Sequence, residues 1–335
     1  MKVTTVCLLA ALGVAAAPSW AQAQATDAEK EARKKWTYGV VWENDRFANT
    51  DRHYTNGAQI RAVSPRDDTL GLGDWLWDDL LLDPQGHRRV GFALGQSMFT
   101  PDDLTKDDLI VDDRPYAGWL YGTVAVISEG KKELRQLSLD VGVVGPWALG
   151  EEVQTVVHEA INVTTPQGWD NQLENEPGVV LSYQHRWRNV LADPGTGLGI
   201  DLTPHLSASA GNVFTHAAAG LSFRFGQDLP ADYGPPRINP SLAGSTVFQP
   251  EEDFGWYLFL GGEGRAVARN IFLDGNTFED SHSVDKKTFV GDVQAGLAIT
   301  FERVRLTYTY VFRTKEFEEQ EEADQFGALS LSVRF

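Results

Sequence analysis

The end of the chain, residues 329–335, alternates strictly between apolar and polar side chains. The apolar positions are Leu329, Leu331, Val333 and Phe335. A period of two places alternate side chains on opposite faces of an extended chain, so this segment is predicted to be a β-strand with one apolar face. An α-helix would need a period near 3.6 residues, which these positions do not have.

The same alternation recurs along the chain from residue 36 onward and predicts about twelve strands, an even number as in bacterial single-chain barrels. They are Trp36–Asn44, Tyr54–Ser64, Arg88–Phe99, Tyr116–Ser128, Glu133–Val144, Gly178–Trp187, Gly197–Ser209, Val213–Phe225, Gly255–Ala268, Thr288–Ile299, Arg303–Phe312 and the strand that ends at Phe335. We therefore expect an all-β fold, a transmembrane antiparallel up-and-down β-barrel with a short helix in an extracellular loop. A soluble lipocalin-like barrel or sandwich would also explain the alternation.

Aromatic residues favour the membrane barrel over the soluble alternative. Trp, Tyr and Phe recur near the predicted strand ends, where the aromatic girdles of membrane barrels lie. The terminal Phe335 resembles the last residue of outer-membrane barrels, which a soluble sandwich does not explain.

The first 25 residues have the pattern of a secretory signal peptide. Lys2 precedes a short apolar stretch, Val6–Ala17, and Ala21-Gln22-Ala23 offers a cleavage site with small residues. The apolar stretch is too short for a membrane anchor, which is the alternative interpretation. We expect residues 1–25 to be cleaved, residues 26–35 to form a charged periplasmic tail, and residues 36–335 to form a barrel in the outer membrane.

Charge and cysteine content exclude several classes of function. Lys and Arg number 29 against 47 Asp and Glu, a net charge of −18, so nucleic acid is not an expected partner. The single cysteine, Cys7, lies in the predicted signal peptide. The exported chain therefore has no disulfide, no thiolate metal site and no cysteine nucleophile.

If both ends of the barrel chain face the periplasm, alternate connections are extracellular and the others are periplasmic turns. Two of the predicted periplasmic connections, residues 65–87 and 226–254, are too long for turns. The first has a helix-like apolar pattern around Trp75 and Leu80. The sequence assigns neither a function.

Most polar motifs fall on the predicted extracellular side, and one of them is helical. Residues Gly150–Asn162 are predicted to form a helix on which Glu151, Gln154 and His158 share one face. A neutral imidazole beside carboxylates and amides can act as a general base. Asp45, next to Asn44, offers hard oxygen ligands for Ca²⁺. Taken singly, such a histidine can instead be structural, and such acids can form a solvated surface.

Several motifs taken together resemble the outer-membrane lipid A 3′-O-deacylase family, in order and spacing, over nearly the whole exported chain. They are Glu43-Asn44-Asp45, Thr50-Asp51-Arg52, Tyr54-Thr55-Asn56-Gly57, Arg114-Pro115-Tyr116-Ala117-Gly118, Gly145-Pro146, Gln154 with His158, Gly168-Trp169 through Gln172, and Glu174-Asn175-Glu176. The resemblance implies a twelve-stranded barrel whose active site lies at the outer rim beside a loop helix. It also implies Ca²⁺-dependent hydrolysis of the ester that holds the 3′ acyloxyacyl chain of lipid A, the lipid of lipopolysaccharide.

The resemblance also implies a role for individual residues. His158 corresponds to the catalytic base, and Asn44, Thr55 and Lys106 to further catalytic residues, with Asp45 and Asn44 as metal ligands. The family has a glutamate six residues after the histidine, where this chain has Thr164. Either Glu152 or Glu159 substitutes for that acid, or the metal is held differently.

Two other functions remain open at this point. His53-Tyr54-Thr55-Asn56-Gly57 loosely resembles the site of an outer-membrane phospholipase with a hydroxyl nucleophile. A non-enzymatic porin or adhesin would use the same acids to select or bind cations. The Gly-x-Ser-x-Gly motif of α/β-hydrolases is absent from the sequence.

Overall fold

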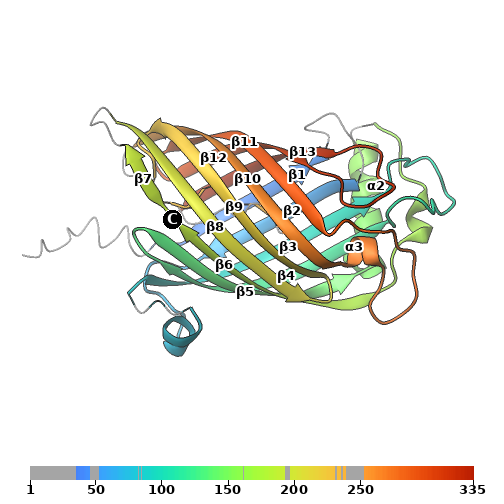
Figure 1. The fold of residues 1–335 in the computed structure, drawn as a ribbon, viewed down its shortest axis with the longest axis horizontal. Helices are drawn as coiled ribbons and strands as arrows, with labels where there is room; N and C mark the ends of the chain where they lie inside the picture. The colour runs from blue at the N-terminus through green and yellow to red at the C-terminus, as the bar shows by residue number, and fades with distance from the viewer. Residues whose placement is uncertain are drawn as a thin grey trace, which may run out of the picture. The chain divides into compact units, whose positions relative to one another are not determined.

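Twelve long antiparallel strands form a closed barrel in the computed structural model (Figure 1). The structure describes residues 35–45, 53–81, 83, 85–160, 162–192, 197–230, 232–234, 237–238 and 253–335. The predicted signal peptide, the tail up to residue 34 and the motif at residues 50–52 lie outside the described residues. The strands are β1 (Thr37–Asn44), β2 (His53–Val63), β3 (His87–Thr100), β4 (Ala117–Glu129), β5 (Glu133–Val144), β6 (Glu176–Trp187), β8 (Leu198–Gly211), β9 (Phe214–Gln227), β10 (Phe254–Asn270), β11 (Phe289–Phe301), β12 (Val304–Arg313) and β13 (Asp324–Arg334).

Each strand pairs with its neighbours in sequence, and two further pairings close the ring. β1 pairs with β13, and β6 pairs with β8. The short strand β7 (Asn189–Ala192) pairs only with β8 and adds no member to the ring. The predicted antiparallel twelve-stranded barrel is confirmed.

The barrel is apolar outside and polar inside. On β12, Val304, Leu306 and Tyr308 face outward and are exposed, whereas Arg305 and Thr307 are buried in the interior. A soluble barrel has the opposite arrangement, so the alternation belongs to a barrel that faces lipid. Among the described residues, no helix is long and apolar enough to cross a membrane.

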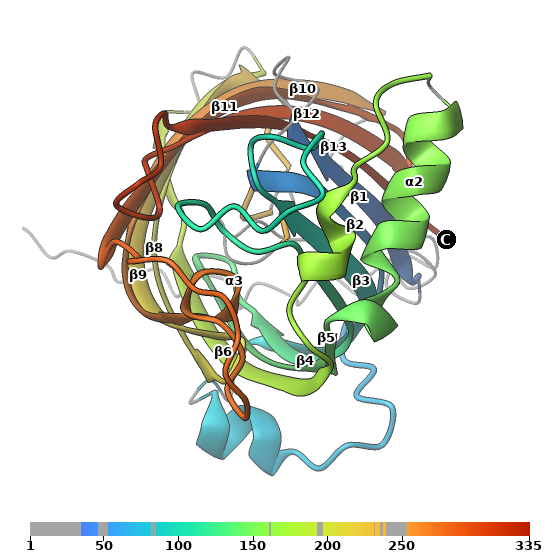
Figure 2. The same cartoon turned by 90° about the vertical axis from the view of Figure 1, so that its right-hand side faces the viewer.

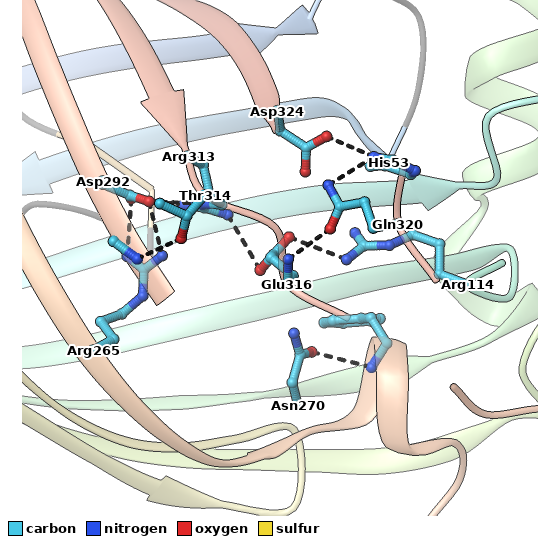
Figure 3. Close-up of polar contacts among 12 residues, drawn as sticks. His53, Arg114, Arg265, Asn270, Asp292, Arg313, Thr314, Glu316, Gln320 and Asp324 are labelled. Carbon is cyan, nitrogen blue, oxygen red and sulfur yellow. Dashed lines mark hydrogen bonds and ion pairs between the residues drawn. The ribbon is translucent and has the colours of Figure 1, made fainter. Parts of the chain in front are cut away.

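Several buried charges in the lumen are paired with opposite charges on adjacent strands. Asp292 on β11 accepts hydrogen bonds from Arg265 on β10 and Arg313 on β12, at 2.9 to 3.1 Å (Figure 3). Arg224 on β9 pairs in the same way with Asp201 on β8. An unpaired charge in such an interior would be strongly destabilising, so these pairs hold adjacent strands in register.

An aromatic layer fills the lumen at one end of the barrel, which we call the rim because it carries the helix α2 (Gly150–Ala160). Figure 2, which looks at the rim, shows the short helix α3 (Ile271–Asp274) inside the ring of strands. Phe272 of α3 stacks on Phe99 of β3 with ring centroids 3.9 Å apart. Buried residues of the same cluster include Tyr54, Trp119, Phe214 and Phe326. This layer is the main apolar core of the molecule.

The connection between β9 and β10 enters the lumen from the opposite end, which we call the turn end. We call its described residues 229–230, 232–234 and 237–238 the luminal segment. Its Tyr233 hydroxyl donates to the Gly130 carbonyl, 2.8 Å away, in the tight turn between β4 and β5. Further along, Asp232 pairs with Arg224 and Arg305, and Arg237 reaches Glu43 near the rim end of β1. The described residues of the long connection predicted at residues 226–254 therefore lie inside the lumen, from the turn end to Glu43.

The other long connection, between β2 and β3, packs on the outer wall at the turn end. Its single helical turn η2 (Leu76–Leu80) buries Trp77, whose indole nitrogen donates to the Ile127 carbonyl at 2.9 Å. Trp77 packs with Val90 and Val126 on positions that would otherwise face lipid. The helix-like pattern found in this part of the sequence is confirmed as a short helix.

Deletion of Phe335 is expected to impair assembly of the barrel. The Phe335 amide donates to the Trp36 carbonyl at 2.9 Å, and its ring lies 6.3 Å from that of Tyr38, so it extends the β1–β13 closure. We expect less heat-modifiable, folded protein in the outer membrane, measured by electrophoresis without boiling. Phe335→Tyr, which keeps the ring, is the control, and normal folded yield after deletion would contradict this role.

Candidate active site

Close packing holds α2 against the barrel wall at the rim. Gln96 of β3 donates from Nε2 to the Ala148 carbonyl at 2.6 Å, just before the helix begins. A Cβ on Gly150 would lie 2.6 Å from the ring of Trp169, and one on Gly118 would lie 2.9 Å from the Cβ of Ala148. Larger residues at these glycines would therefore push the helix off the wall. The predicted helix is confirmed, and it ends two residues earlier than expected.

Two polar residues of α2 are buried, and both are held by the segment that follows the helix. Gln154 is 2 % exposed and accepts a 2.8 Å hydrogen bond from the Trp169 indole. His158 is 3 % exposed, and its Nδ1 lies 2.6 Å from the Thr164 carbonyl. A carbonyl only accepts, so Nδ1 carries the proton and Nε2 presents its lone pair. This is the tautomer that a general base requires.

The two acids at the start of α2 lie apart from this buried pair. Glu151 and Glu152 are both exposed. Of the three residues predicted to share one face of the helix, Gln154 and His158 are buried and Glu151 is exposed. The first turn of the helix carries its acids into solvent, where they still interact favourably with the helix dipole.

Asn44 and Thr55 meet where β1 and β2 reach the rim. The Asn44 amide donates to the Thr55 carbonyl at 3.0 Å and to Asn56 Oδ1 at 3.3 Å. The Thr55 hydroxyl is buried and lies 2.7 Å from the hydroxyl of Thr100. Asp45 is 1 % exposed. The structure thus brings three of the predicted site residues, Asn44, Asp45 and Thr55, to the ends of two adjacent strands.

We call Asn44, Asp45 and Thr55 the strand group, and Gln154 and His158 of α2 the helix group. One stretch of the barrel wall connects the two groups. Gln96, which holds the start of α2, pairs across β3 and β2 with Ala58, and Ala58 pairs with Trp42 on β1. Figure 2 shows α2 extending along the side of the barrel formed by β1, β2 and β3. The start of α2 and the ends of β1 and β2 are therefore joined through the paired strands β3, β2 and β1.

Lys106 lies on the loop between β3 and β4. Its ammonium is half-exposed and 3.6 Å from the Asp103 carboxylate. Hydrogen bonds from the hydroxyl and amide of Thr105 lower the pKa of Asp103, so this acid is ionised at neutral pH. The loop contacts the segment after α2, because the Gln167 amide donates to the Leu104 carbonyl at 3.0 Å. Lys106 is thus carried next to the segment that orients His158.

His53 is buried at the rim end of β2, and Figure 3 shows it beside Asp324 of β13. Its Nδ1 lies 2.5 Å from Asp324 and its Nε2 lies 3.6 Å from Asp113. Both ring nitrogens face carboxylate oxygens, which suits a structural role better than that of a base, because a base needs a nitrogen turned toward water. Its neighbours Arg114 and Glu316 form a further buried pair at 3.1 Å.

The donor atoms at the strand group suit Ca²⁺ in kind. Ca²⁺ takes carboxylate, amide and main-chain carbonyl oxygens together with water. Asp45 supplies a buried carboxylate and Asn44 an amide oxygen. Within the described ranges, no three His, Cys, Asp or Glu residues cluster to form a complete metal site. Further oxygens would have to come from water, main-chain carbonyls or substrate.

The sequence did not point to the residues that hold the site together. Gln96 and Trp169 act through a main-chain carbonyl and a buried amide, and neither stands out by composition. Thr164 was singled out in the sequence only because it replaces a glutamate of the family. In the structure its main-chain oxygen orients His158. A contact made by a main-chain atom can be formed by any residue type, so it cannot be predicted from residue identity. The indole of Trp169, within the Gly168-Trp169 motif, was the only available signal.

An apolar exterior, a filled polar lumen and a buried, oriented histidine on a rim helix define an outer-membrane β-barrel enzyme. The sequence profile of the family described as outer membrane protein LpxR matches residues 6–335. The chain belongs to this family, the lipid A 3′-O-deacylases that its motifs resemble, and is an ester hydrolase.

The comparison with solved structures agrees with the fold. LpxR from Salmonella typhimurium superposes with a TM-score of 0.73 at 20 % identity, over 89 % of this chain and all of that one. The β domain of the Bordetella autotransporter BrkA reaches a TM-score of only 0.43 at 10 % identity, over 90 % of this chain and 98 % of that one. No curated protein matches the sequence.

Proposed function

We propose that the protein hydrolyses the ester of the 3′ acyloxyacyl chain of lipid A at the rim, beside α2 and the ends of β1 and β2, with His158 as general base. The observation that supports this most directly is the 2.6 Å hydrogen bond from His158 Nδ1 to the Thr164 carbonyl. It leaves Nε2 able to accept a proton from water, and the burial of the ring limits its other orientations.

In the proposed reaction, water attacks the ester carbonyl carbon while His158 Nε2 takes one of its protons. A carbon–oxygen bond forms to the water oxygen, and the bond to the sugar oxygen breaks. The proton then passes from His158 to the departing sugar oxygen, so the products are a free fatty acid and a sugar hydroxyl. Gln154 holds Trp169, which packs against the first residue of the helix and so keeps His158 in place.

Negative charge develops on the carbonyl oxygen during this attack, and we propose that Asn44 and Asp45 help to oppose it. Asp45 and Asn44 are the residues that would hold Ca²⁺, which supplies positive charge to a developing oxyanion. Lys106 is proposed to add a further cation at the same side, and Thr55 fixes the backbone around Asn44. Glu152 is exposed on α2 and is retained only as a possible additional acid for the metal.

The hydroxyl-nucleophile alternative is less well supported. The Thr55 hydroxyl is paired with Thr100, and His53 is paired with Asp324 and Asp113. A nucleophile of this type needs its base within hydrogen-bond reach. Hydrolysis of glycerophospholipid that persists after loss of His158 would favour this alternative.

A porin function is also less well supported, because the lumen is filled. The luminal segment lies inside it, from the turn end to Glu43, and the aromatic layer around Phe272 occupies the rim end. We expect the purified barrel to show no stable pore conductance in planar bilayers. Regular single-channel steps at neutral pH would contradict this expectation and would favour a porin function.

Mass spectrometry of lipid A tests the proposed function. Cells that produce the protein should yield lipid A lighter by one 3′ acyloxyacyl chain than cells without it. Production of the His158→Gln protein should leave lipid A unmodified. Lipid A of unchanged mass, with folded protein in the membrane and Ca²⁺ present, would overturn the proposal.

A further inference from the structure

Glu43 lies on the lumen side of β1, immediately before Asn44. Side chains alternate across a strand, and here Val41 and Glu43 are buried, Trp42 is exposed and Asn44 is half-buried. A single peptide bond therefore separates a residue held inside the barrel from a residue of the proposed site on the outer wall. Whatever fixes Glu43 also fixes the direction in which β1 presents Asn44.

Arg237 of the luminal segment holds Glu43 from inside. Its Nε donates to Glu43 Oε1 at 2.6 Å, and the amide of Ile238 donates to the same oxygen at 3.1 Å. Both charged side chains are 1 % exposed. Such charge-assisted hydrogen bonds in a dry interior are strong and directional.

Arg237 is itself fixed by the strands around it. Its Nη1 donates to Gln294 on β11 at 2.8 Å, and its guanidinium lies 5.5 Å from the ring centroid of Phe326 on β13. Arg61 on β2 donates to its main-chain carbonyl. Five residues earlier, Asp232 anchors the luminal segment to Arg224 and Arg305. The position of the guanidinium is thus set by several strands of the ring.

We propose that Arg237 is a positioning residue for the deacylation reaction, acting through Glu43 on Asn44 and Asp45 from the opposite side of the barrel wall. The inference rests on the proposed function, because it needs Asn44 and Asp45 to act in the site. Without Arg237, the buried Glu43 carboxylate keeps the electrostatic interaction with Arg61 but loses its hydrogen-bonded countercharge, so we expect β1 to shift to solvate it. A displacement of about 1 Å in a catalytic group can cost about 10²-fold in rate.

Arg237→Ala, with Arg186→Ala as its matched control, tests the inference. Arg186 is an equally buried luminal arginine that bonds the Tyr233 carbonyl and Gln184, and the described contacts do not join it to Glu43. We expect Arg237→Ala to lower kcat by about 10- to 100-fold while KM for lipid A stays within about twofold, the range reported for residues that support metal ligands. The same variant should bind Ca²⁺ more weakly by a similar factor in calorimetric titration. Arg237→Lys, which keeps a cation facing Glu43, should recover most of both.

The outcomes separate this inference from the proposed function. If the unmodified protein releases the 3′ chain and His158→Gln does not, but Arg237→Ala matches Arg186→Ala in kcat and in Ca²⁺ affinity, the positioning role is wrong. If the unmodified protein releases no 3′ chain, the proposed function fails first. Should Arg237→Ala not fold, Glu43→Gln provides the test: it keeps the shape and an acceptor oxygen, and unchanged kcat and Ca²⁺ affinity in that variant would overturn the inference.

Discussion

His158→Gln is expected to lower release of the 3′ acyl chain by about 10²- to 10⁴-fold, the usual contribution of a general base. The glutamine amide has no basic nitrogen, but it can still donate to the Thr164 carbonyl that His158 bonds now. The surroundings of the helix are therefore preserved while proton transfer is lost. The measurement is the rate of 3′ chain release by purified, folded protein, followed by mass spectrometry.

The matched control is His87→Gln at the turn end. His87 pairs with Asp67 in an exposed position, so the same chemical change should leave the rate unaltered. Deacylation by His158→Gln at the unmodified rate would place the base elsewhere. His53 would then be the next candidate, despite its two carboxylate partners.

Asp45→Asn and removal of Ca²⁺ should each lower activity by about 10²- to 10³-fold, the usual cost of losing one element of oxyanion stabilisation. Asparagine keeps the size of the buried side chain and removes the negative charge that would hold a cation. Chelation followed by Ca²⁺ addition should restore the unmodified protein fully and Asp45→Asn only at much higher Ca²⁺. The rate of chain release against Ca²⁺ concentration is the measurement.

Asp79→Asn is the control for this change, since Asp79 is exposed on η2 at the turn end. Its Ca²⁺ dependence should equal that of the unmodified protein. Full turnover after bound metal has been removed, in excess chelator, would remove the metal from the proposed reaction. The role of His158 would then stand on its own test.

The strands were predictable because one rule governs every one of them. A lipid-facing barrel repeats the same two-residue alternation, and β12 follows it without interruption, with aromatic and aliphatic residues outside and Arg305, Thr307 and Arg313 inside. The helix α2 was predictable from its own period. The outer-wall helix η2 was indicated by the spacing of Trp75 and Leu80, but not its packing on Val90, because that contact joins residues from two separate elements.

The site was less predictable than the fold, for a physical reason. Asn44, Asp45, Thr55 and His158 were named from motifs, and the structure places the first three together on adjacent strands. The contacts that orient them come from main-chain oxygens and from residues distant in sequence, such as Trp169 for Gln154. A helical projection groups Glu151 with Gln154 and His158, but it takes no account of where the wall ends, so it could not predict that Glu151 is exposed.

The luminal segment also constrains how the barrel can be assembled. Asp232 pairs with β9 and β12, whereas Arg237 pairs with β1, β11 and, through its ring contact, β13. These strands come from both ends of the chain, and their inner faces are accessible from the side only while β1 and β13 are apart. The luminal segment must therefore lie inside the curved sheet before β1 pairs with β13. Otherwise it must enter later through an open end of the closed barrel. In the first order the sheet closes around the charged segment, so variants that weaken the ion pairs of Asp232 or Arg237 should accumulate as sheets that have not closed.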